Sequence, residues 1–488
     1  MENVIKEFRY GIKKLNNKKC IKPSQLLKVL NIKKKDIKQF WNNDIKELSD
    51  RLWLPDKTNR FRKKNMDSWF KTIRLKNNPY QKVLLNMVLS DKKITKSKTI
   101  KIYPTSFQKK YLKKCIGSYR FFYNKTLKYI KDNPPKKVFK KFPKGTYILF
   151  EGEYMRVQCN GTHKLIYENL PSLYSLRKII KQDSPDWIKT DSIDSHLIDQ
   201  AINECCKSFQ TNIFKGKKFK MKYKSRQRNV RETMIFEAIA FSKKYNSFYT
   251  TKKRLGKCNI KSSEPFLNMN KLGSSLTYHR VLHTWMLHVN YETQGIQYTN
   301  RNNMCALDPG VNKFMTMYSP EETILFGKGS GDVIHNKCKE MDIIQSEMTK
   351  CNHKKRQDLK MRLHRMIRKI KNIRNDLHWK TINYLTKTYN KIVLPSFDTK
   401  NMISKLCHKV SRMMNTLSFY TFKQRMKFKC QERDVKLVIG NEAYTSRTCT
   451  RCGTLKKIKG QTYKCNSCNL VVDRDVLGSR NIYLKYSI

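Results

Sequence analysis

Three separate carboxylates could do chemistry in the C-terminal half of this chain. Asp308 follows the apolar run MCAL, Glu442 closes the apolar run before the cysteine-rich segment, and one of Asp473 and Asp475 begins a final amphipathic segment. Clustered carboxylates suit Mg²⁺, which prefers oxygen ligands and keeps several waters. Two such ions can align a water molecule and polarise a phosphodiester. We therefore predict that these acids hold two Mg²⁺ ions and form the hydrolytic site of a nuclease.

Each acid also has an ordinary structural explanation. Asp308 precedes a Pro-Gly pair and could be a turn aspartate. Asp473 or Asp475 could cap the final helix, and only one of this pair is expected to face a cleft. Glu442 could be a solvated strand end. The hydrolytic interpretation rests on their shared placement at the ends of elements.

Four cysteines have the spacing of a metal site. Two residues separate the members of each pair and twelve residues separate the pairs, which are Cys449, Cys452, Cys465 and Cys468. Four thiolates fill a tetrahedral zinc shell and leave no open position, so this spacing predicts a structural zinc ribbon. A redox pair is the alternative. The other eleven cysteines are irregularly spaced, which indicates a reducing compartment.

The charge of the chain predicts a polyanionic partner. There are 104 basic and 38 acidic residues, a formal net charge of +66, distributed along the whole chain. Such a distribution fits an extended nucleic acid lying over several domains. A codon bias toward lysine is the alternative. One basic stripe is a candidate contact with the phosphate backbone, or else a solvated strand: Lys217, Lys218, Lys220, Lys222 and Lys224.

No membrane partner is predicted. The N-terminal residues lack the apolar core of a signal peptide, and no run approaches 18 consecutive apolar residues.

Changes of pattern along the chain predict the elements that must position these groups. The predicted domains are a basic helical extension (1–95), a β-domain (96–300) with a helical insertion (about 105–215), an α/β domain (301–444), the ribbon (445–472) and a final part of the α/β domain (473–488). Thr105 is a predicted helix N-cap. In the α/β domain we expect strands around MCALDPG, FMTMYS, ETILFG, KIVLPSF and VKLVIGNEA, with long helices over 333–390 that break near Asn375. His378 lies in mid-helix and is predicted to be structural.

Several segments together resemble the OrfB/TnpB family of transposon-encoded, RNA-guided nucleases, which are related to Cas12. They are LDPGVNKFMTMYS, KNIRNDLHWKTINYL, YTSRTCTRCG, YKCNSC and DRDVLGSRNIYL, with the N-terminal KIYPTSFQKKYLKKCIGSYRFFYNKTL and KKFKMKYKSR. The resemblance implies an α/β RNase H-like RuvC domain with an inserted zinc ribbon. It also implies a preceding β-barrel-like wedge domain with a helical recognition insertion. Asp308 and Asp475 match the first and third catalytic acids of the family.

The second acid departs from the bacterial pattern. The central strand reads KIVLPSFDTKNM, with Pro395 and Ser396 where a glutamate is expected. This departure resembles the eukaryotic and giant-virus branch, called Fanzor, in which the glutamate lies on the strand before the ribbon. Glu442 matches that relocated position. Asp398 is the alternative second acid.

The resemblance implies an RNA-guided DNA endonuclease encoded by a transposable element. Its partners would be a guide RNA, with one protein per guide, and double-stranded target DNA that carries a short flanking motif. A eukaryotic or virus-infected host implies action in the nucleus. The alternatives are a catalytically inactive nucleic-acid-binding relic or regulator, and a guide-free DNA-joining transposase.

Overall fold

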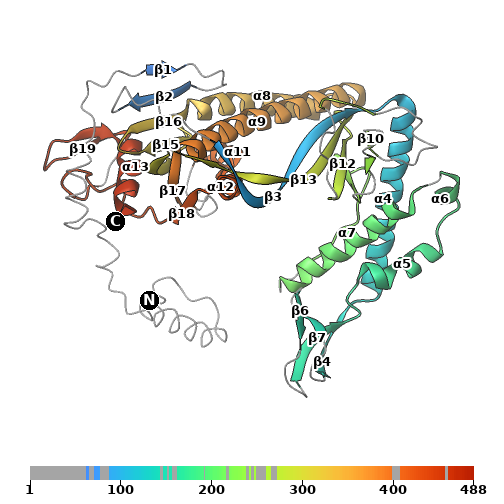
Figure 1. Cartoon of the computed structure of the whole chain (residues 1–488). Helices are drawn as coiled ribbons and strands as arrows, with labels where there is room; N and C mark the ends of the chain where they lie inside the picture. Colours follow the sequence, from blue (N-terminus) through green and yellow to red (C-terminus); the bar gives the residue numbers. More distant parts are fainter. Residues whose placement is uncertain are drawn as a thin grey trace. The chain divides into compact units, whose positions relative to one another are not determined.

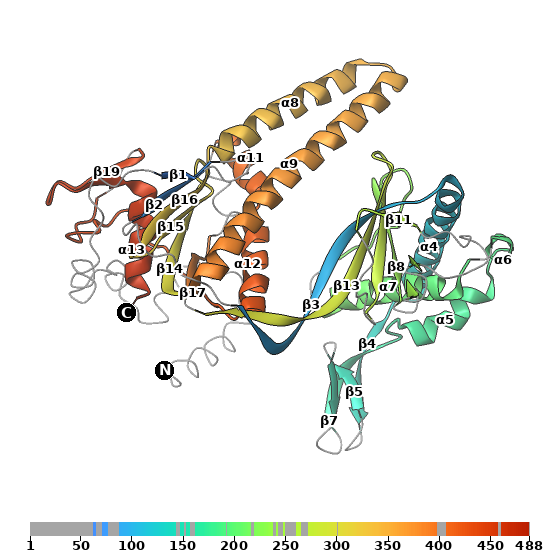
Figure 2. The same ribbon diagram turned by 45° about the horizontal axis from the view of Figure 1, so that its top comes forward.

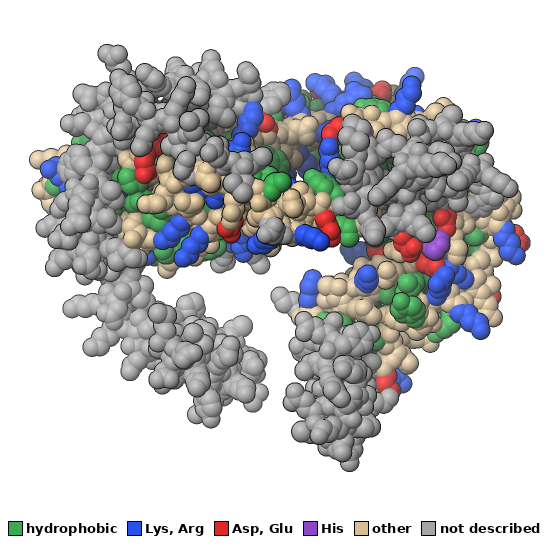
Figure 3. All heavy atoms as spheres, viewed as in Figure 1, with side chains coloured by type: hydrophobic (Ala, Val, Ile, Leu, Met, Phe, Trp, Pro, Cys, Tyr) green, Lys and Arg blue, Asp and Glu red, His purple; other side chains and the backbone are tan. Residues whose placement is uncertain are grey.

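The structure is a computed structural model, and it describes residues 62–64, 71–76, 87–142, 147–150, 153–156, 162–191, 193–215, 219–237, 241–242, 247–248, 260–264, 272–299, 301–397, 407–456 and 460–487. The chain divides into two compact units. The first unit contains Met1–Ser90, Gly295–Lys350 and Met366–Ile488, and the second contains Asp91–Gln294 and Cys351–Arg365. Figure 3 shows Lys and Arg side chains spread over the visible surface of both units rather than gathered in one tail. None of the described helices has the length and hydropathy needed to cross a bilayer.

A seven-stranded mixed sheet forms the centre of the first unit (Figure 1). In spatial order its strands are β1 (Arg62–Lys64), β2 (Lys71–Lys76), β16 (Glu322–Lys328), β15 (Met315–Tyr318), β14 (Asn302–Pro309), β17 (Tyr389–Pro395) and β18 (Lys436–Gly440). β14, β15 and β16 form an antiparallel meander, whereas β14, β17 and β18 run parallel. The carboxyl ends of these three parallel strands therefore lie at one edge of the sheet.

Helices cover both faces of this sheet (Figure 2). Helix α13 (Arg474–Lys485) packs on one face, where Met304 and Ala306 of β14 point. The opposite face, with Cys305 and Leu307, packs against α8 (Ser330–Lys350), α9 (His353–Thr388), α11 (His408–Leu417) and α12 (Phe419–Arg433). Alternate residues of a strand face opposite sides, so Asp308 continues the row that faces α13.

The α/β pattern read from the sequence is confirmed, with differences in its helices. α9 runs through Asn375 without a break, because the Asn375 side chain accepts a hydrogen bond of 2.9 Å from Arg425 of α12 instead of bonding its own backbone. The helices break at 351–352 instead, where Asn352 accepts from the amide of Lys355 at 3.0 Å and caps α9. α11 and α12 are separated by Ser418, which has φ 54°.

The N-terminal extension is not helical where the structure describes it. β1 and β2 pair with each other, and β2 adds to the edge of the sheet beside β16. The segment Lys71–Lys76 alternates apolar and basic residues, which is a strand pattern. Pairing with an open sheet edge outweighs any helical tendency of this basic segment.

The second unit is built on a five-stranded sheet. Its order is β11 (Lys261–Ser262), β3 (Met87–Tyr103), β13 (Thr284–Tyr298), β12 (Ser274–His279) and β8 (Arg231–Phe236). α4 (Ser106–Asp132) and α7 (Ser195–Phe214) share a core with this sheet, together with α5 (Leu173–Gln182) and α6 (Trp187–Thr190). Thr105 caps α4 through a reciprocal capping box with Gln108, as predicted.

The insertion between β3 and β8 is only partly helical. It also contains the strand pair β4 (Lys136–Phe142) with β7 (Thr162–Glu168), and the pair β5 (Tyr147–Phe150) with β6 (Glu153–Arg156). The KKVFKKF segment contains a β-branched valine and two phenylalanines, residue types that favour a strand. The helical insertion predicted over about 105–215 thus also contains short strands between its helices. The remaining short strands are β9 (Phe241–Ser242), β10 (Ser247–Phe248), β19 (Thr462–Lys464) and β20 (Val471–Asp473).

Candidate active site

Asp308 lies near the end of β14, on the face covered by α13. It pairs across the sheet with Thr316 of β15. Gly478 of α13 is in direct contact with it, because a Cβ built on Gly478 would lie 2.4 Å from Oδ2 of Asp308. No side chain fits at position 478 without moving the carboxylate or the helix. The glycine therefore allows α13 to approach the end of β14 closely.

The two aspartates at the start of α13 have different roles. Asp473 is the N-cap and accepts from the amides of Asp475 and Val476, at 3.0 and 3.4 Å. Asp475, in the first turn, is the one whose charge acts on Asp308. Asp473 thus caps the helix, whereas Asp475 acts on Asp308, as expected if only one of the pair faces the cleft.

Lys313 joins these two aspartates. Its Nζ lies 2.7 and 2.6 Å from the two carboxylate oxygens of Asp473, and 3.0 Å from Oδ2 of Asp475. The lysine side chain is only 8% exposed. Gln461, just before β19, also donates to Oδ2 of Asp475, at 3.1 Å. Asp475 is therefore fixed by a buried cation and by a residue of the cysteine-rich segment.

Glu442 lies two residues beyond the end of β18, in a loop rather than in the predicted strand. The backbone amide of the preceding Asn441 donates to the hydroxyl of Tyr486, just after α13, and its carbonyl accepts from Lys485, the last residue of α13. Thr445 donates twice to the carbonyl of Glu442, from its amide at 3.2 Å and from its hydroxyl at 2.8 Å. The loop is thus anchored on both sides of the half-buried Glu442.

The charges of the other two predicted acids act on Asp308. Burial is the largest cause that raises the pKa of Asp308 well above its ordinary value. The charges of Asp475 and Glu442 raise the pKa of Asp308 further, and Arg474 and Lys313 lower it. Burial also raises the pKa of Glu442. The fold therefore buries Asp308 where negative charge is costly and where the charges of Asp475 and Glu442 reach it.

The four cysteines of the predicted metal site converge. Their sulfur atoms all lie within 4.8 Å of one another, and the pairs Cys449–Cys468 and Cys452–Cys465 are each 3.5 Å apart. Gly453 has φ 76°, which allows the tight turn after the first pair. This geometry fits one tetrahedral zinc ion. Within the described residues, the three carboxylates are not gathered as tightly as these sulfurs.

The cysteine-rich segment is fixed to α13. Asn481 donates to the carbonyls of Thr445 and Thr448, at 2.7 and 2.8 Å. Arg480 is 1% exposed and donates to the carbonyl of Thr450 at 2.8 Å. The same helix therefore carries Asp475 and supports the base of the cysteine site.

Sequence reasoning missed Lys313, Gly478 and Gln461. A lysine placed directly before the apolar strand FMTMY, and a glycine within the final helix, were the available signals. His378 is fully buried and donates from Nε2 to the carbonyl of Leu417 at 2.9 Å, as a structural residue would. Asp398 lies outside the described residues.

The predicted basic stripe is only partly described. Lys217 and Lys218 lie outside the described residues, and Lys220 and Lys222 are exposed. Lys224 is engaged by both oxygens of Glu204, at 2.9 and 2.7 Å. The segment from 219 to 230 forms a loop rather than a strand.

The donor set suits two kinds of metal ion. Carboxylate oxygens are the ligands that Mg²⁺ prefers, and a bound cation would relieve the repulsion among them. Asp308, Glu442 and Asp475 are the residues that would hold Mg²⁺. Sulfur donors with tetrahedral spacing suit Zn²⁺.

Comparisons with known proteins agree with this geometry. Residues 288–406 match a family model described as a probable transposase, OrfB_IS605. Residues 419–482 match the Cas12f1-like TNB domain, and residues 94–133 match the OrfB_IS605 helix-turn-helix domain. A putative transposase of Paramecium bursaria Chlorella virus 1 is 30% identical over 304 residues, which are 59% of this chain and 68% of that protein. The chain belongs to the OrfB/TnpB family.

Other similar proteins come from a giant virus and from a bacterium. A TnpB-like protein of Acanthamoeba polyphaga mimivirus is 31% identical over 326 residues, which are 63% of this chain. This chain spans 61% of the length of that relative. The Cas12f1 endodeoxyribonuclease of Sulfoacidibacillus thermotolerans is 28% identical over 75 residues. A Cas12f1–sgRNA–target DNA complex aligns with a TM-score of 0.37 and 10% identity, over 80% of this chain and 98% of that one.

Proposed function

We propose that this TnpB-family protein is an RNA-guided DNA endonuclease with a RuvC-like site made by Asp308, Glu442 and Asp475. The observation that carries the proposal is the electrostatic coupling of Asp308 to the other two acids. A structural turn residue or helix cap has no reason to lie beside two further carboxylates in a chain of net charge +66. Bound Mg²⁺ would supply an activated water and charge neutralisation for phosphodiester hydrolysis.

The residues of the chain have separate tasks in this proposal. Asp308 is presented by a rigid strand, and Asp475 by the first turn of α13. Glu442 is presented by the anchored loop after β18 and takes the part of the acid missing from the end of β17. Lys313, a positioning residue, orients Asp475 and reduces repulsion among the acids.

Recognition of the target is assigned to the guide RNA and to a short DNA motif beside the target. Membership of the TnpB family and the basic charge of the chain support nucleic-acid partners. We further propose a zinc ribbon at Cys449, Cys452, Cys465 and Cys468, membership of the Fanzor branch, one protein per guide RNA, and action in the nucleus of the host. The departure at Pro395–Ser396 supports the Fanzor assignment.

Expression with the native flanking DNA tests this function directly. Sequencing of the co-purified RNA should give one dominant species from the edge of the element, with a variable end. Addition of matching duplex DNA and Mg²⁺ should then give cleavage. A heterogeneous mixture of host RNA and intact DNA would favour a catalytically inactive nucleic-acid-binding protein instead.

A further inference from the structure

A buried hydroxyl group beside Asp308 has no function in the fold itself. Thr316 of β15 is 1% exposed, and its Oγ1 atom is buried without a hydrogen-bond partner among the described residues. Burial of a hydroxyl is unfavourable unless a partner compensates for the lost contact with water. We propose that Thr316 is a further positioning residue of the candidate active site, whose hydroxyl donates to Asp308 and holds that carboxylate in the orientation that binds Mg²⁺.

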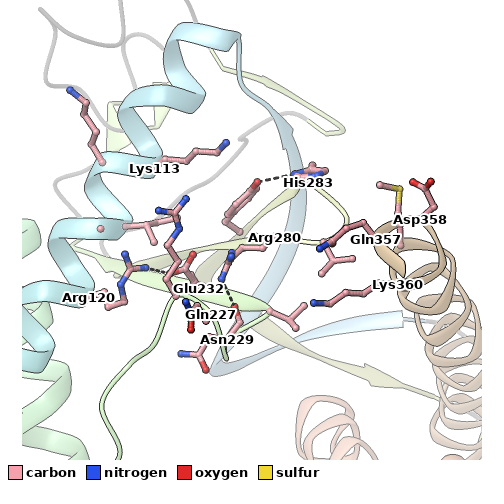
Figure 4. Close-up of a pocket in the computed structure, with 18 residues that line it drawn as sticks. Lys113, Arg120, Gln227, Asn229, Glu232, Arg280, His283, Gln357, Asp358 and Lys360 are labelled. Carbon is pink, nitrogen blue, oxygen red and sulfur yellow. Dashed lines mark hydrogen bonds and ion pairs between the residues drawn. The ribbon is translucent and has the colours of Figure 1, made fainter. Parts of the chain in front are cut away.

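Polar side chains elsewhere in the protein usually pair with one another. In the 690 Å³ cavity of the second unit, Arg120 pairs with Glu232 (Figure 4). At the wall of the same cavity, the hydroxyl of Tyr278 bonds to Nδ1 of His283 at 3.1 Å. Buried polar groups in native proteins are satisfied as a rule, so the hydroxyl of Thr316 requires an explanation.

Asp308 is the polar neighbour of Thr316 across the sheet. The β14–β15 register places these two residues directly opposite each other, and the β15–β16 register places Leu325 on the other side of Thr316. Side chains at directly opposite positions project from the same face of the sheet, with their Cβ atoms about 5 Å apart. Of the two cross-strand neighbours, only Asp308 can accept a hydrogen bond from the hydroxyl.

Helix α13 covers this face of the sheet and keeps water from the hydroxyl. Tyr318, two residues beyond Thr316 on β15, packs with Ile482 and Tyr483 of α13. Gly478 of the same helix is in contact with Asp308. Because the oxygen of Thr316 is buried beneath these contacts, its partner must come from within the site.

Asp308 needs such a partner if it holds a metal ion. In the part of the chain that the structure describes, the Asp308 carboxylate accepts no hydrogen bond. Carboxylates that ligate metals are themselves hydrogen-bonded, and loss of such a partner typically costs about 10- to 100-fold in metal affinity. A change of rotamer at either residue would bring the hydroxyl to the carboxylate. The inference rests on the proposed function, because it takes Asp308 as a metal ligand.

The first test is Thr316→Val in the full chain, which keeps the shape of the side chain and removes the hydroxyl. Without added Mg²⁺ or Mn²⁺, the melting temperature should equal or exceed that of the wild type, because the fold loses no hydrogen bond. Calorimetric titration with Mn²⁺ alone, which takes the same oxygen ligands, measures the site. The affinity of the binding that Asp308→Asn abolishes should fall by about 10- to 100-fold.

Thr323→Val is the matched control. Thr323 is as buried as Thr316 and its Oγ1 also lacks a partner among the described residues, but it lies on β16 and pairs with Tyr318 rather than with Asp308. This control should keep the wild-type affinity for Mn²⁺. Thr316→Ser, which retains the hydroxyl, should restore most of the affinity that Thr316→Val loses.

Wild-type Mn²⁺ affinity in Thr316→Val, or a loss of affinity that Thr323→Val shares, would overturn the inference. A lowered melting temperature of Thr316→Val with unchanged Mn²⁺ binding would assign the hydroxyl to the fold alone. Failure of the proposed function has a different result, since the wild type itself would then show no Mn²⁺ binding that depends on Asp308. That result refutes the metal site and the role of Thr316 together, whereas the others refute the role of Thr316 only.

Discussion

Lys313 bonds to Asp475 across the candidate site, with 3.0 Å between Nζ and Oδ2. The same ammonium group lies 2.6 Å from Asp473, the cap of α13. Lys313 follows β14 and the aspartates begin α13, so this one cation ties the strand that carries Asp308 to the helix that carries Asp475. It is the internal counter-charge of a site otherwise made of carboxylates.

Replacement of Lys313 by methionine should weaken both the fold and the site. The lysine is 8% exposed but Asp473 is 34% exposed, so we expect a loss of about 1–3 kcal/mol in the free energy of unfolding, below the value for a fully buried pair. Urea unfolding without Mg²⁺ measures it. The matched control is Lys427→Met, at an exposed position of α12.

Mg²⁺ distinguishes a site lysine from a merely structural one. A cation should relieve the unbalanced carboxylates of the Lys313→Met protein more than those of the wild type, so the Mg²⁺-induced rise in melting temperature should be larger. Equal rises in the two proteins would contradict a role for Lys313 in the site.

Gly478→Ala should misplace Asp308. The added Cβ would lie 2.4 Å from Oδ2 of Asp308, so the carboxylate or α13 must shift. We expect a loss of about 1–3 kcal/mol in stability and at least a tenfold loss of cleavage rate, about 1.4 kcal/mol of barrier. Ser479→Ala, in the same helical turn, is the control. A variant that cleaves at the wild-type rate would show that Gly478 does not set the position of Asp308.

Removal of zinc should disable the site indirectly. Gln461 bonds to Asp475, and Leu477 of α13 packs with the cysteines. Cys465→Ser should therefore reduce bound zinc and cleavage together, and Mg²⁺ should not restore cleavage. Metal analysis of the purified protein and a cleavage assay measure the two losses. Cys407→Ser, at an exposed free cysteine, should change neither. Full cleavage by a zinc-free protein would refute the supporting role of the ribbon.

The raised pKa values of Asp308 and Glu442 predict a specific pH dependence. The pKa values of the two carboxyls in the folded protein lie above their ordinary values of 3.8 and 4.5. At pH values between the ordinary and the raised pKa of each group, the folded state therefore binds more protons than the unfolded state. In the metal-free protein, the contribution of these two groups to the free energy of unfolding should therefore decrease as the pH rises from their ordinary pKa values toward their raised ones. Asp308→Asn should reduce this decrease.

Metal binding has the opposite dependence on pH. Mg²⁺ requires ionised carboxylates, so its stabilising effect should disappear as the pH falls through the raised pKa values. Melting temperatures measured over a pH series with and without Mg²⁺ test both expectations. A Mg²⁺ effect that persists down to pH 3.8 would contradict the raised pKa of Asp308.

Local patterns predicted the strands of the α/β domain, and failed where contacts between distant segments determine the structure. The apolar runs at β14, β16 and β17 are buried and therefore visible in the sequence. Asn375 suggested a helix break, but a hydrogen bond from Arg425 satisfies its side chain. β2 depends on an open edge at β16, which no local pattern reveals.

Lys313 shows the same limit within the site. In a chain of 104 basic residues, nothing in the sequence marks one lysine as buried. Asp473, one of the two partners of Lys313, is 160 residues away in sequence. The hydrogen bonds from Tyr486 and Lys485 that anchor Asn441, beside Glu442, are equally non-local. The acids could be predicted because carboxylates are scarce in this chain, whereas their supports could not.

The most direct test of the account is cleavage by Glu442→Gln, which keeps the size of the side chain and removes its charge. The variant, loaded with its co-purified RNA, is compared with Asp308→Asn, Asp398→Asn and the wild type on matching duplex DNA with Mg²⁺. We predict at least a hundredfold loss for Glu442→Gln and Asp308→Asn, with RNA binding unchanged and Asp398→Asn active; a hundredfold corresponds to about 2.7 kcal/mol of barrier. Cleavage retained by Glu442→Gln and lost by Asp398→Asn would contradict the assignment of the second acid.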